Sequence, residues 1–136
     1  MSEGKLKRDN FCFVCGKENP RGMHLSFEKK EDCVTARFSL PNYYQGYENV
    51  IHGGIISLIL DEAMAYLQSL EERFLTGKIT VKFHSPLYAD EEVEVKAWIE
   101  SDRRKYKITK AVMKKLNGKT VAEAEALMFV LKESKE

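Results

Sequence analysis

The chain has 136 residues, of which 43% are hydrophobic and 32% charged, and its formal net charge is +1. This length is enough for one domain with a sizeable core and too short for two. The charge excludes strong bulk attraction to nucleic acid or membrane. No apolar run reaches the roughly 18–20 residues of a spanning helix, and the N-terminus lacks a signal-like apolar stretch. We expect a cytoplasmic protein with a charged, loosely ordered tail (1–10) and one domain (11–136).

The first half of the domain is predicted to be a loop followed by a hairpin. Glycines and an Asn-Pro pair punctuate residues 11–23, which predicts a compact, turn-rich loop. Apolar and polar side chains then alternate over residues 23–28 and again over residues 33–40. Such alternation is typical of half-buried strands. A charged turn at 29–32 would join the two strands, and a tyrosine-rich loop at 41–51 would follow.

The sequence changes character after its His-Gly-Gly triplet at 52–54. Residues 55–70 have the length of a helix, and apolar side chains occur on almost every side of it. A helix that is apolar on all sides is expected to be buried on all sides. In so short a chain the remaining segments must therefore wrap around this single helix.

Four further strands are predicted to provide that wrapping. Their expected ranges are 78–84, 92–100, 106–116 and 119–132. Asn117 and Gly118 predict a tight hairpin turn between the last two strands. The Ala-Glu repeat at 122–126 has good helix propensity, but the turn precedes it directly and the alternation has a period of two. The pattern predicts an antiparallel sheet curled around one central helix, which is an α+β architecture.

Asp61 is the first candidate catalytic residue. A carboxylate within an apolar helix is costly to bury unless it is paired or used in chemistry. Its neighbours on the same helical face are Gly54, Ser57, Ala65 and Gln68. A structural role, with Asp61 hydrogen-bonded in the core or facing solvent, remains an equal alternative at this stage. Glu62 is rotated by about 100° around the helix, so we expect the two carboxylates not to share one site.

The His52-Gly-Gly54 triplet forms the second candidate. Unpaired N–H groups at a helix N-terminus carry partial positive charge and suit a developing oxyanion. The alternative is an ordinary glycine-rich entry into a helix. At 1.5 Å per residue, Asp61 lies about 10 Å along the axis from Gly54. One carbonyl group cannot touch both ends of that span, so joint action would require two chains and predicts a dimer.

The chain contains three cysteines, Cys12, Cys15 and Cys33. This odd, low count argues against a disulfide framework. Cys12 and Cys15 form one Cys-x-x-Cys pair, whereas a structural zinc site generally needs about four ligands and no second pair follows. We interpret the pair as part of the packing of its loop, with a redox or metal-binding role as the alternative. No metal and no cofactor are expected.

Three segments resemble the family of phenylacetyl-CoA-thioesterase-like hotdog proteins that carry a His-Gly-Gly motif. Residues 44–64 resemble its central signature, with Asp61 nine positions after His52 as in that family. Residues 12–25, with their Cys-Phe-Val-Cys-Gly opening, look like the N-terminal signature of one subgroup. Residues 76–86 resemble the strand that follows the helix. In combination, these motifs are far more specific than any of them alone.

The resemblance implies a hotdog fold and the hydrolysis of acyl-CoA to a carboxylic acid and coenzyme A, by a homodimer or a homotetramer made of two dimers. Asp61 would attack the thioester or activate water. Gly53, together with Gly54, would supply the oxyanion N–H groups. His52 would hold the loop and help to hold the carbonyl group, and Thr76 would help to place the nucleophilic water.

Further residues are predicted to bind substrate. Some family members have Asn six positions before the motif histidine, where this chain has Gly46, with Gln45 beside it. Tyr47 belongs to a tyrosine-rich loop that either packs on itself or forms a wall of the acyl pocket. Arg103 and Arg104 either form a solvated turn or bind the phosphates of coenzyme A.

Three other functions are alternatives to the thioesterase. They are a non-catalytic acyl-CoA-binding module on the same scaffold, a hydratase or dehydratase of the same fold, and a small metal-binding interaction protein built on the cysteine pair. Binding without turnover, enoyl-CoA hydration and elemental analysis, respectively, would distinguish them from the thioesterase.

Overall fold

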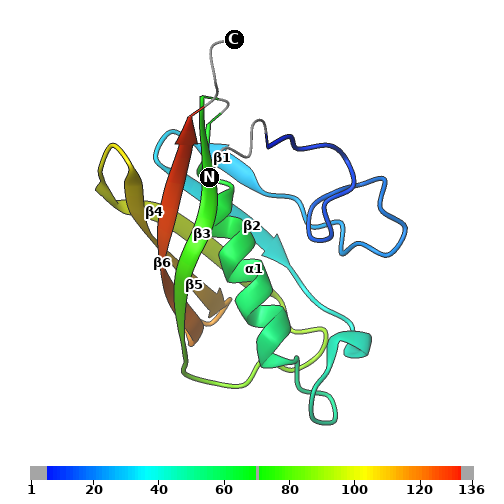
Figure 1. Ribbon diagram of the computed structural model, residues 1–136. Coiled ribbons are helices and arrows are strands. Elements are labelled where there is room, and N and C mark those ends of the chain that lie inside the picture. Colours follow the sequence, from blue (N-terminus) through cyan, green and yellow to red (C-terminus); the bar gives the residue numbers. More distant parts are fainter. Residues whose placement is uncertain (1–5, 70, 133–136) are drawn as a thin grey trace.

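The computed structural model describes residues 6–69 and 71–132, which form one sheet and one long helix (Figure 1). The elements are β1 (Glu28–Lys30), β2 (Cys33–Phe38), the 3-10 helix η1 (Asn42–Tyr44), α1 (Gly53–Ala65), β3 (Glu72–Phe83), β4 (Val93–Asp102), β5 (Tyr106–Lys115) and β6 (Thr120–Lys132). All neighbouring strands are antiparallel, in the order β1-β2-β4-β5-β6-β3. The predicted order of two strands, one helix and four strands is confirmed.

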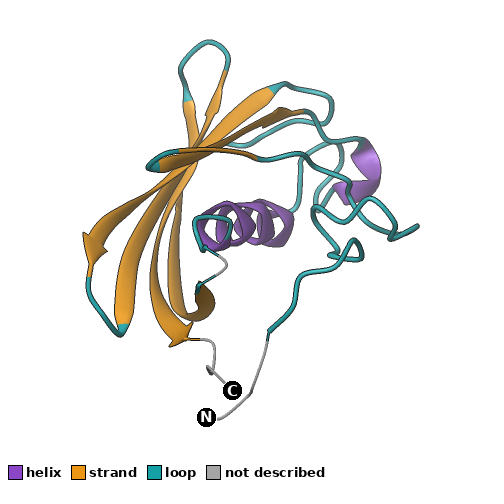
Figure 2. Cartoon of the chain, turned by 90° about the horizontal axis from the view of Figure 1, so that it is seen from above, coloured by secondary structure: helices purple, strands orange, loops and turns teal. Residues whose placement is uncertain are grey.

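The sheet curves around α1, which lies in its hollow (Figure 2). The inward-facing side chains of each strand and the buried side of the helix form one apolar core. The prediction that residues 119–132 form a strand is confirmed, because β6 occupies nearly that range and pairs with both β5 and β3. Ala122, Ala124 and Ala126 are all buried in this strand. Their small side chains allow the helix and the sheet to approach closely.

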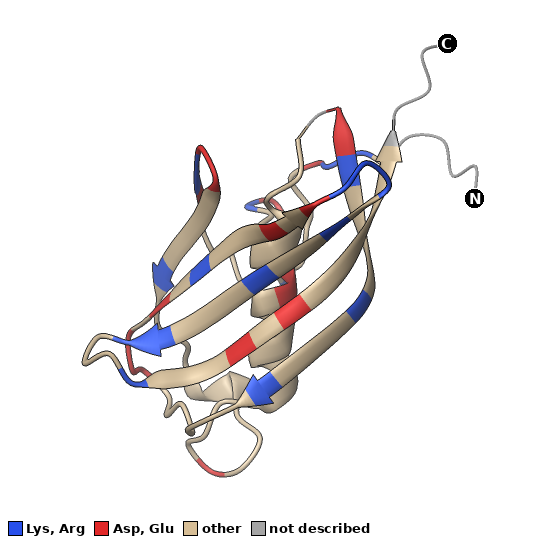
Figure 3. Cartoon of the chain, turned by 90° about the vertical axis from the view of Figure 1, so that its left-hand side faces the viewer, with Lys and Arg blue, Asp and Glu red and all other residues tan. Residues whose placement is uncertain are grey.

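Charged residues of both signs lie along the strands of the sheet (Figure 3). Glu94 and Lys96 on β4 are exposed between buried neighbours, as the alternation in their sequence predicts. Lys110 on β5 lies 3.8 Å from Glu125 on β6, so opposite charges face each other across neighbouring strands. The concave face of the sheet therefore packs on the helix, and the convex face is polar.

The predicted first strand at 23–28 is wrong. Residues 23–27 have no place in the sheet, and β1 begins only at Glu28. The backbone N–H groups of Met23 and Leu25 instead donate to the carbonyls of Phe13 and Val14, in the turn-rich loop. The alternation was real, since Leu25 is buried and Ser26 is exposed, but the segment pairs with that loop instead of with β2.

The helix is shorter and less enclosed than predicted. It starts at Gly53, is followed by turns after Ala65, and so does not fill the predicted range 55–70, of which residue 70 lies outside the described residues. Five of its side chains are buried, namely Ile56, Ile59, Leu60, Ala63 and Met64. The side that carries Ser57 and Asp61 is half-buried. The sheet of one chain does not close around α1, so all-round burial is not reached within a single chain.

The strand after the helix is longer than predicted, because β3 covers Glu72–Phe83 instead of 78–84. It lies at one edge of the sheet and pairs only with β6. Its pairing shifts register between Thr76 and Lys78, which makes Gly77 the extra residue of a β-bulge. The bulge interrupts the period of two, so the sequence pattern revealed only the second half of the strand.

Half of the predicted N-terminal tail (1–10) lies outside the described residues, which begin at residue 6. Of the part that is described, Arg8 contacts Glu62 on α1. In the described ranges no helix is long and apolar enough to cross a membrane.

Candidate active site

Asp61 and Thr76 form a direct pair between the helix and the edge strand. The hydroxyl of Thr76 donates to Oδ1 of Asp61 over 2.6 Å. Asp61 is half-buried and Thr76 is exposed. Among the described residues, no other hydrogen bond to the Asp61 carboxylate is found, so Oδ2 is available to a ligand or to water. The structure thus brings together two residues that the sequence predicted separately.

The bulge at Gly77 explains how Thr76 reaches the helix. A side chain at position 77 would place its Cβ only 2.2 Å from the ring of Phe129, which lies on the neighbouring strand β6. A side chain there would displace the ring, so glycine allows the ring to keep its present position. The extra residue shifts the register directly after Thr76, and a bulge of this kind re-aims the side chains beside it. The local sequence Thr-Gly-Lys therefore directs the hydroxyl toward Asp61.

His52 caps the N-terminus of α1. Its Nδ1 accepts a hydrogen bond of 2.8 Å from the backbone N–H of Gly54. A ring nitrogen that accepts carries no hydrogen, so the hydrogen of the neutral imidazole is on Nε2. A Cβ at position 54 would lie 3.1 Å from Nδ1, which is closer than an ordinary contact, so a larger residue would push the ring away. The ring of His52 is exposed and can present its Nε2–H to a ligand.

The two glycines of the motif therefore differ. The N–H of Gly54 is used by His52, whereas no hydrogen bond from the N–H of Gly53 is found within the described parts of the chain. The ring of Phe83, at the end of β3, lies 3.4 Å from the Cβ position of Gly53 and shields one side of it. Gly53 thus offers the unpaired donor, and Gly54 is not free to join it as predicted.

A single chain does not bring the two ends of the predicted site together. Eight residues of helix separate Gly53 from Asp61, which corresponds to about 12 Å along the axis. Both residues lie on the side of α1 that the sheet leaves uncovered. The carboxylate and the free amide therefore belong to one open face but cannot contact the same carbonyl group within one chain.

The loop before the helix forms hollows on either side of His52. One has a volume of about 450 Å³ and is lined by Gly46, Tyr47, Val50, Ile51, His52 and Gly53. The other, of about 380 Å³, is lined by Tyr43, Tyr44, Gln45, His52, Gly54 and Ile55. The predicted binding residues Gln45, Gly46 and Tyr47 therefore surround the helix entry. A Cβ at position 46 would lie 3.4 Å from the imidazole ring of His52, and 87% of Tyr47 is exposed.

Arg103 and Arg104 lie elsewhere in the chain, in the hairpin between β4 and β5. This hairpin is at the end of the sheet where β3 begins, opposite the N-terminus of α1 (Figure 1). At that end an ion pair of 3.6 Å joins Lys107, on β5, to Glu72, at the start of β3. Both arginines are exposed. One chain therefore does not combine them with the His52 loop.

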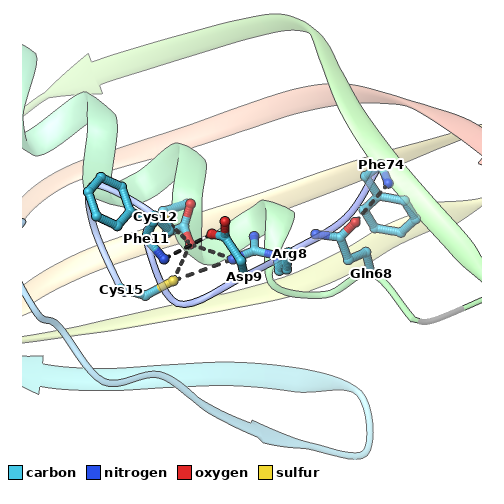
Figure 4. Close-up of polar contacts among 8 residues, drawn as sticks. Arg8, Asp9, Phe11, Cys12, Cys15, Gln68 and Phe74 are labelled. Atoms are coloured by element: carbon cyan, nitrogen blue, oxygen red, sulfur yellow. Dashed lines mark hydrogen bonds and ion pairs between the residues drawn. The ribbon is translucent and has the colours of Figure 1, made fainter. Parts of the chain in front are cut away.

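A second polar cluster, which the sequence analysis missed, lies on another side of α1. The Glu62 carboxylate contacts both thiols of the Cys-x-x-Cys pair and the guanidinium of Arg8. Figure 4 shows Arg8, Cys12 and Cys15 meeting beside the helix. Burial and the hydrogen bond to Glu62 raise the pKa of Cys15 to about 12. The cysteines and Glu62 are about fifty positions apart in the sequence, so no local pattern predicted their contact. The only signals in the sequence were an isolated Cys-x-x-Cys pair and a second carboxylate on the helix.

Comparisons with known structures agree with this architecture. A hypothetical thioesterase from Streptococcus pneumoniae with coenzyme A is 19% identical, with a TM-score of 0.74 over 81% of this chain and 88% of its own. A Streptococcus mutans protein bound to acetyl-CoA is 18% identical, with a TM-score of 0.75 over 82% and 91%. The E. coli PaaI protein from the phenylacetic acid degradation operon is 15% identical, with a TM-score of 0.75 over 81% of both chains. The comparison with curated proteins finds no match.

An antiparallel sheet wrapped around one helix, together with these neighbours, defines the class as a hotdog-fold protein, which confirms the predicted fold. The model of the thioesterase superfamily matches residues 48–122, from the loop before the helix to the start of β6. The chain therefore belongs to the thioesterase superfamily, a class of thioester hydrolases. The predicted resemblance is confirmed at the level of this superfamily.

Proposed function

We propose that the protein hydrolyses acyl-CoA thioesters to a carboxylic acid and coenzyme A, with Asp61 as the catalytic carboxylate. The observation that carries this proposal is the contact of 2.6 Å between Thr76 and Asp61 on the open face of α1. It orients one carboxylate oxygen and leaves the other available for chemistry. A thioester needs little more, because the thiolate is a good leaving group.

The similar structures support the choice of substrate and of residues. Two of them hold coenzyme A or acetyl-CoA. The S. pneumoniae thioesterase was also solved as a variant with an aspartate changed to alanine and as another with a threonine changed to alanine. Those residue types are the ones that meet here as Asp61 and Thr76. We therefore assign the pair to the reaction and the thioester of coenzyme A to the substrate.

In the proposed reaction, Asp61 accepts a proton from water while the water oxygen attacks the thioester carbon. The carbonyl oxygen becomes an oxyanion and accepts a hydrogen bond from the N–H of Gly53, with Nε2–H of His52 as a second donor. The C–S bond then breaks, and the sulfur leaves with the electron pair. Asp61 returns the proton to that thiolate. Direct attack by Asp61, followed by hydrolysis of the resulting anhydride, would use the same groups.

The active site is proposed to form between two copies of the chain. Gly53 and Asp61 are too far apart along one helix to hold the same carbonyl group. The strand β3 is a sheet edge of 12 residues, and such an edge can pair with the same strand of a second copy. A two-fold pairing of this kind would place the Gly53 amide of one protomer opposite Asp61 of the other. A tetramer would join two such dimers.

The primary test is the release of free thiol from a panel of acyl-CoAs of different chain length and aromatic character. We expect turnover by the wild-type chain and the loss of nearly all of it in Asp61→Asn with its fold intact. Binding of acyl-CoA by calorimetry without turnover of any member of the panel would identify a non-catalytic binding module instead. Undiminished turnover by Asp61→Asn would remove this carboxylate from the mechanism.

The shared site has a separate test that uses two inactive variants. Gly53→Pro removes the proposed oxyanion donor, and proline is well tolerated as the first helical residue. His52 already has the extended conformation, φ −59 and ψ 134, that a following proline requires. Dimers assembled from Gly53→Pro and Asp61→Asn chains should regain about a quarter of the wild-type activity, because half of them are mixed and each mixed dimer has one intact site. A site within one chain would regain none.

A further inference from the structure

The turn that carries Cys12 and Cys15 is tightly constrained. The N–H of Gly16 donates to the carbonyl of Cys12 over 2.8 Å, which closes the turn around both cysteines. A Cβ at position 16 would lie 2.3 Å from the backbone nitrogen of Cys12, so only glycine fits there. This geometry brings both thiols to the same side of the loop, toward α1.

The helix supplies a third donor to the same point. Oε2 of Glu62 lies 3.2 Å from Sγ of Cys15 and 3.6 Å from Sγ of Cys12. The three donor atoms lie within 4.8 Å of one another. Only 12% of the Glu62 side chain is exposed, and a carboxylate this buried is usually paired, as Glu62 is here with Arg8. The cluster belongs to neither the Asp61 pair nor the hollows around His52.

These separations match the coordination of a single tetrahedral zinc ion. Zinc binds thiolate sulfur at about 2.3 Å and carboxylate oxygen at about 2.0–2.2 Å, so sulfur and oxygen around one ion are about 3.5 Å apart. The two observed distances of 3.2 and 3.6 Å lie on either side of that value. We propose that Cys12, Cys15 and Glu62 form a zinc site that fastens the N-terminal loop to the central helix.

The donor set also favours zinc over other common cations. Thiolates are soft ligands that calcium and magnesium do not use, because these ions take oxygen ligands. Two thiolates and one carboxylate around a divalent ion leave one net negative charge. Arg8 supplies the opposite charge, because its Nη1 lies 3.1 Å from Oε2 of Glu62 and 3.4 Å from Sγ of Cys15. Three protein ligands leave the fourth position to water.

Binding at this site has a defined proton balance and a structural effect. The zinc ion replaces the hydrogens of both thiols, which are released to solvent, and no oxidation or reduction takes place. The ion would connect residues 12–15 of the loop to α1. We therefore expect zinc to protect the loop from proteases and to raise the melting temperature. The proposal is independent of the proposed acyl-CoA hydrolysis, because its readout is metal binding.

The test uses the reduced full-length chain, with zinc competing against a chromophoric chelator and cobalt as a spectroscopic probe. We expect one zinc per chain and thiolate-to-cobalt charge-transfer absorption. In Cys12→Ser, Cys15→Ser and Glu62→Gln the affinity should fall by more than about tenfold, since losing even an outer-sphere partner costs that much. Cys33→Ser is the matched control, because Cys33 lies on β2 outside the cluster and its loss should leave zinc binding unchanged.

A second measurement needs no variant and so does not depend on the folding of one. Zinc should slow the alkylation of Cys12 and Cys15 in the wild-type chain and leave that of Cys33 unchanged. Absence of zinc binding, a cobalt spectrum without thiolate bands, or unchanged affinity in the Cys12→Ser and Cys15→Ser chains would overturn the proposal. A chain that forms a Cys12–Cys15 disulfide readily, yet binds no zinc when reduced, would overturn it in favour of a redox pair.

Discussion

On α1, Asp61 and Glu62 are neighbours in the sequence, but their carboxylates have different surroundings. Asp61 has one donor, the Thr76 hydroxyl, on the side of the helix that the sheet leaves open. Glu62 contacts Arg8, Cys12 and Cys15 beneath the N-terminal loop. A carboxylate with a free oxygen on an open face suits a reaction, whereas an enclosed carboxylate with several partners suits a structural or metal-binding role. Residue type alone does not distinguish the two.

Replacing Asp61 gives the largest expected effect and tests the first half of the comparison. In Asp61→Asn, kcat for acyl-CoA should fall by about 10²–10⁴-fold, the usual contribution of a general base. Because Asp61 is half exposed, the free energy of unfolding should change by less than about 1 kcal/mol. Thiol-release kinetics and urea unfolding of the same sample check both statements. A large loss of stability with activity retained would reverse the roles assigned to the two carboxylates.

The next effect concerns the hydroxyl that orients Asp61. Thr76→Val keeps the shape of the side chain and removes the hydrogen bond, so kcat should fall by about 10–100-fold, the value of a hydrogen bond to a charged group. Thr76→Ser is the control and should recover most of the activity. If valine and serine behave alike in steady-state kinetics, the hydroxyl does not position the carboxylate.

Glu62→Gln tests the enclosed side of the helix. Removing the charge weakens the pair with Arg8, which lies 3.1 Å away, and leaves polar atoms poorly matched where little of the Glu62 side chain is exposed. Unfolding in urea with a chelator present, so that no metal contributes, should show a loss of about 1–3 kcal/mol. This loss should exceed that of Asp61→Asn. Equal losses for the two variants would mean that the two faces of α1 do not differ as described.

The smallest effect is expected at the hairpin between β4 and β5, which lies on neither face of α1 within one chain. If Arg103 and Arg104 bind the phosphates of a substrate held between two protomers, KM should rise by about two- to fivefold at low salt in Arg103→Ala and Arg104→Ala. The difference should disappear at high salt, because exposed charges are screened. A KM equal to that of the wild-type chain at low salt in both variants would return the hairpin to a solvated turn.

The sequence by itself determined the fold and the order of its elements. The apolar helix, the alternating strands and the Asn117-Gly118 turn all depend on local periodicity, which neighbouring residues record directly. The polar face with Asp61 and the His-Gly-Gly entry were visible for the same reason, since both lie within a few turns of one helix. The period of two failed at 23–28, where an alternating segment pairs with a loop, and before residue 78, where a bulge interrupts it.

Only the tertiary structure decided which groups meet. The contact between Thr76 and Asp61 depends on a bulge opposite Phe129, and the use of the Gly54 N–H depends on the rotamer of His52. The cluster around Glu62 joins residues about fifty positions apart. Contacts of this kind arise from the packing of distant segments, and no periodicity within either segment encodes them. The sheet likewise leaves one side of α1 uncovered because it ends at the edge strand β3, which local sequence patterns do not predict.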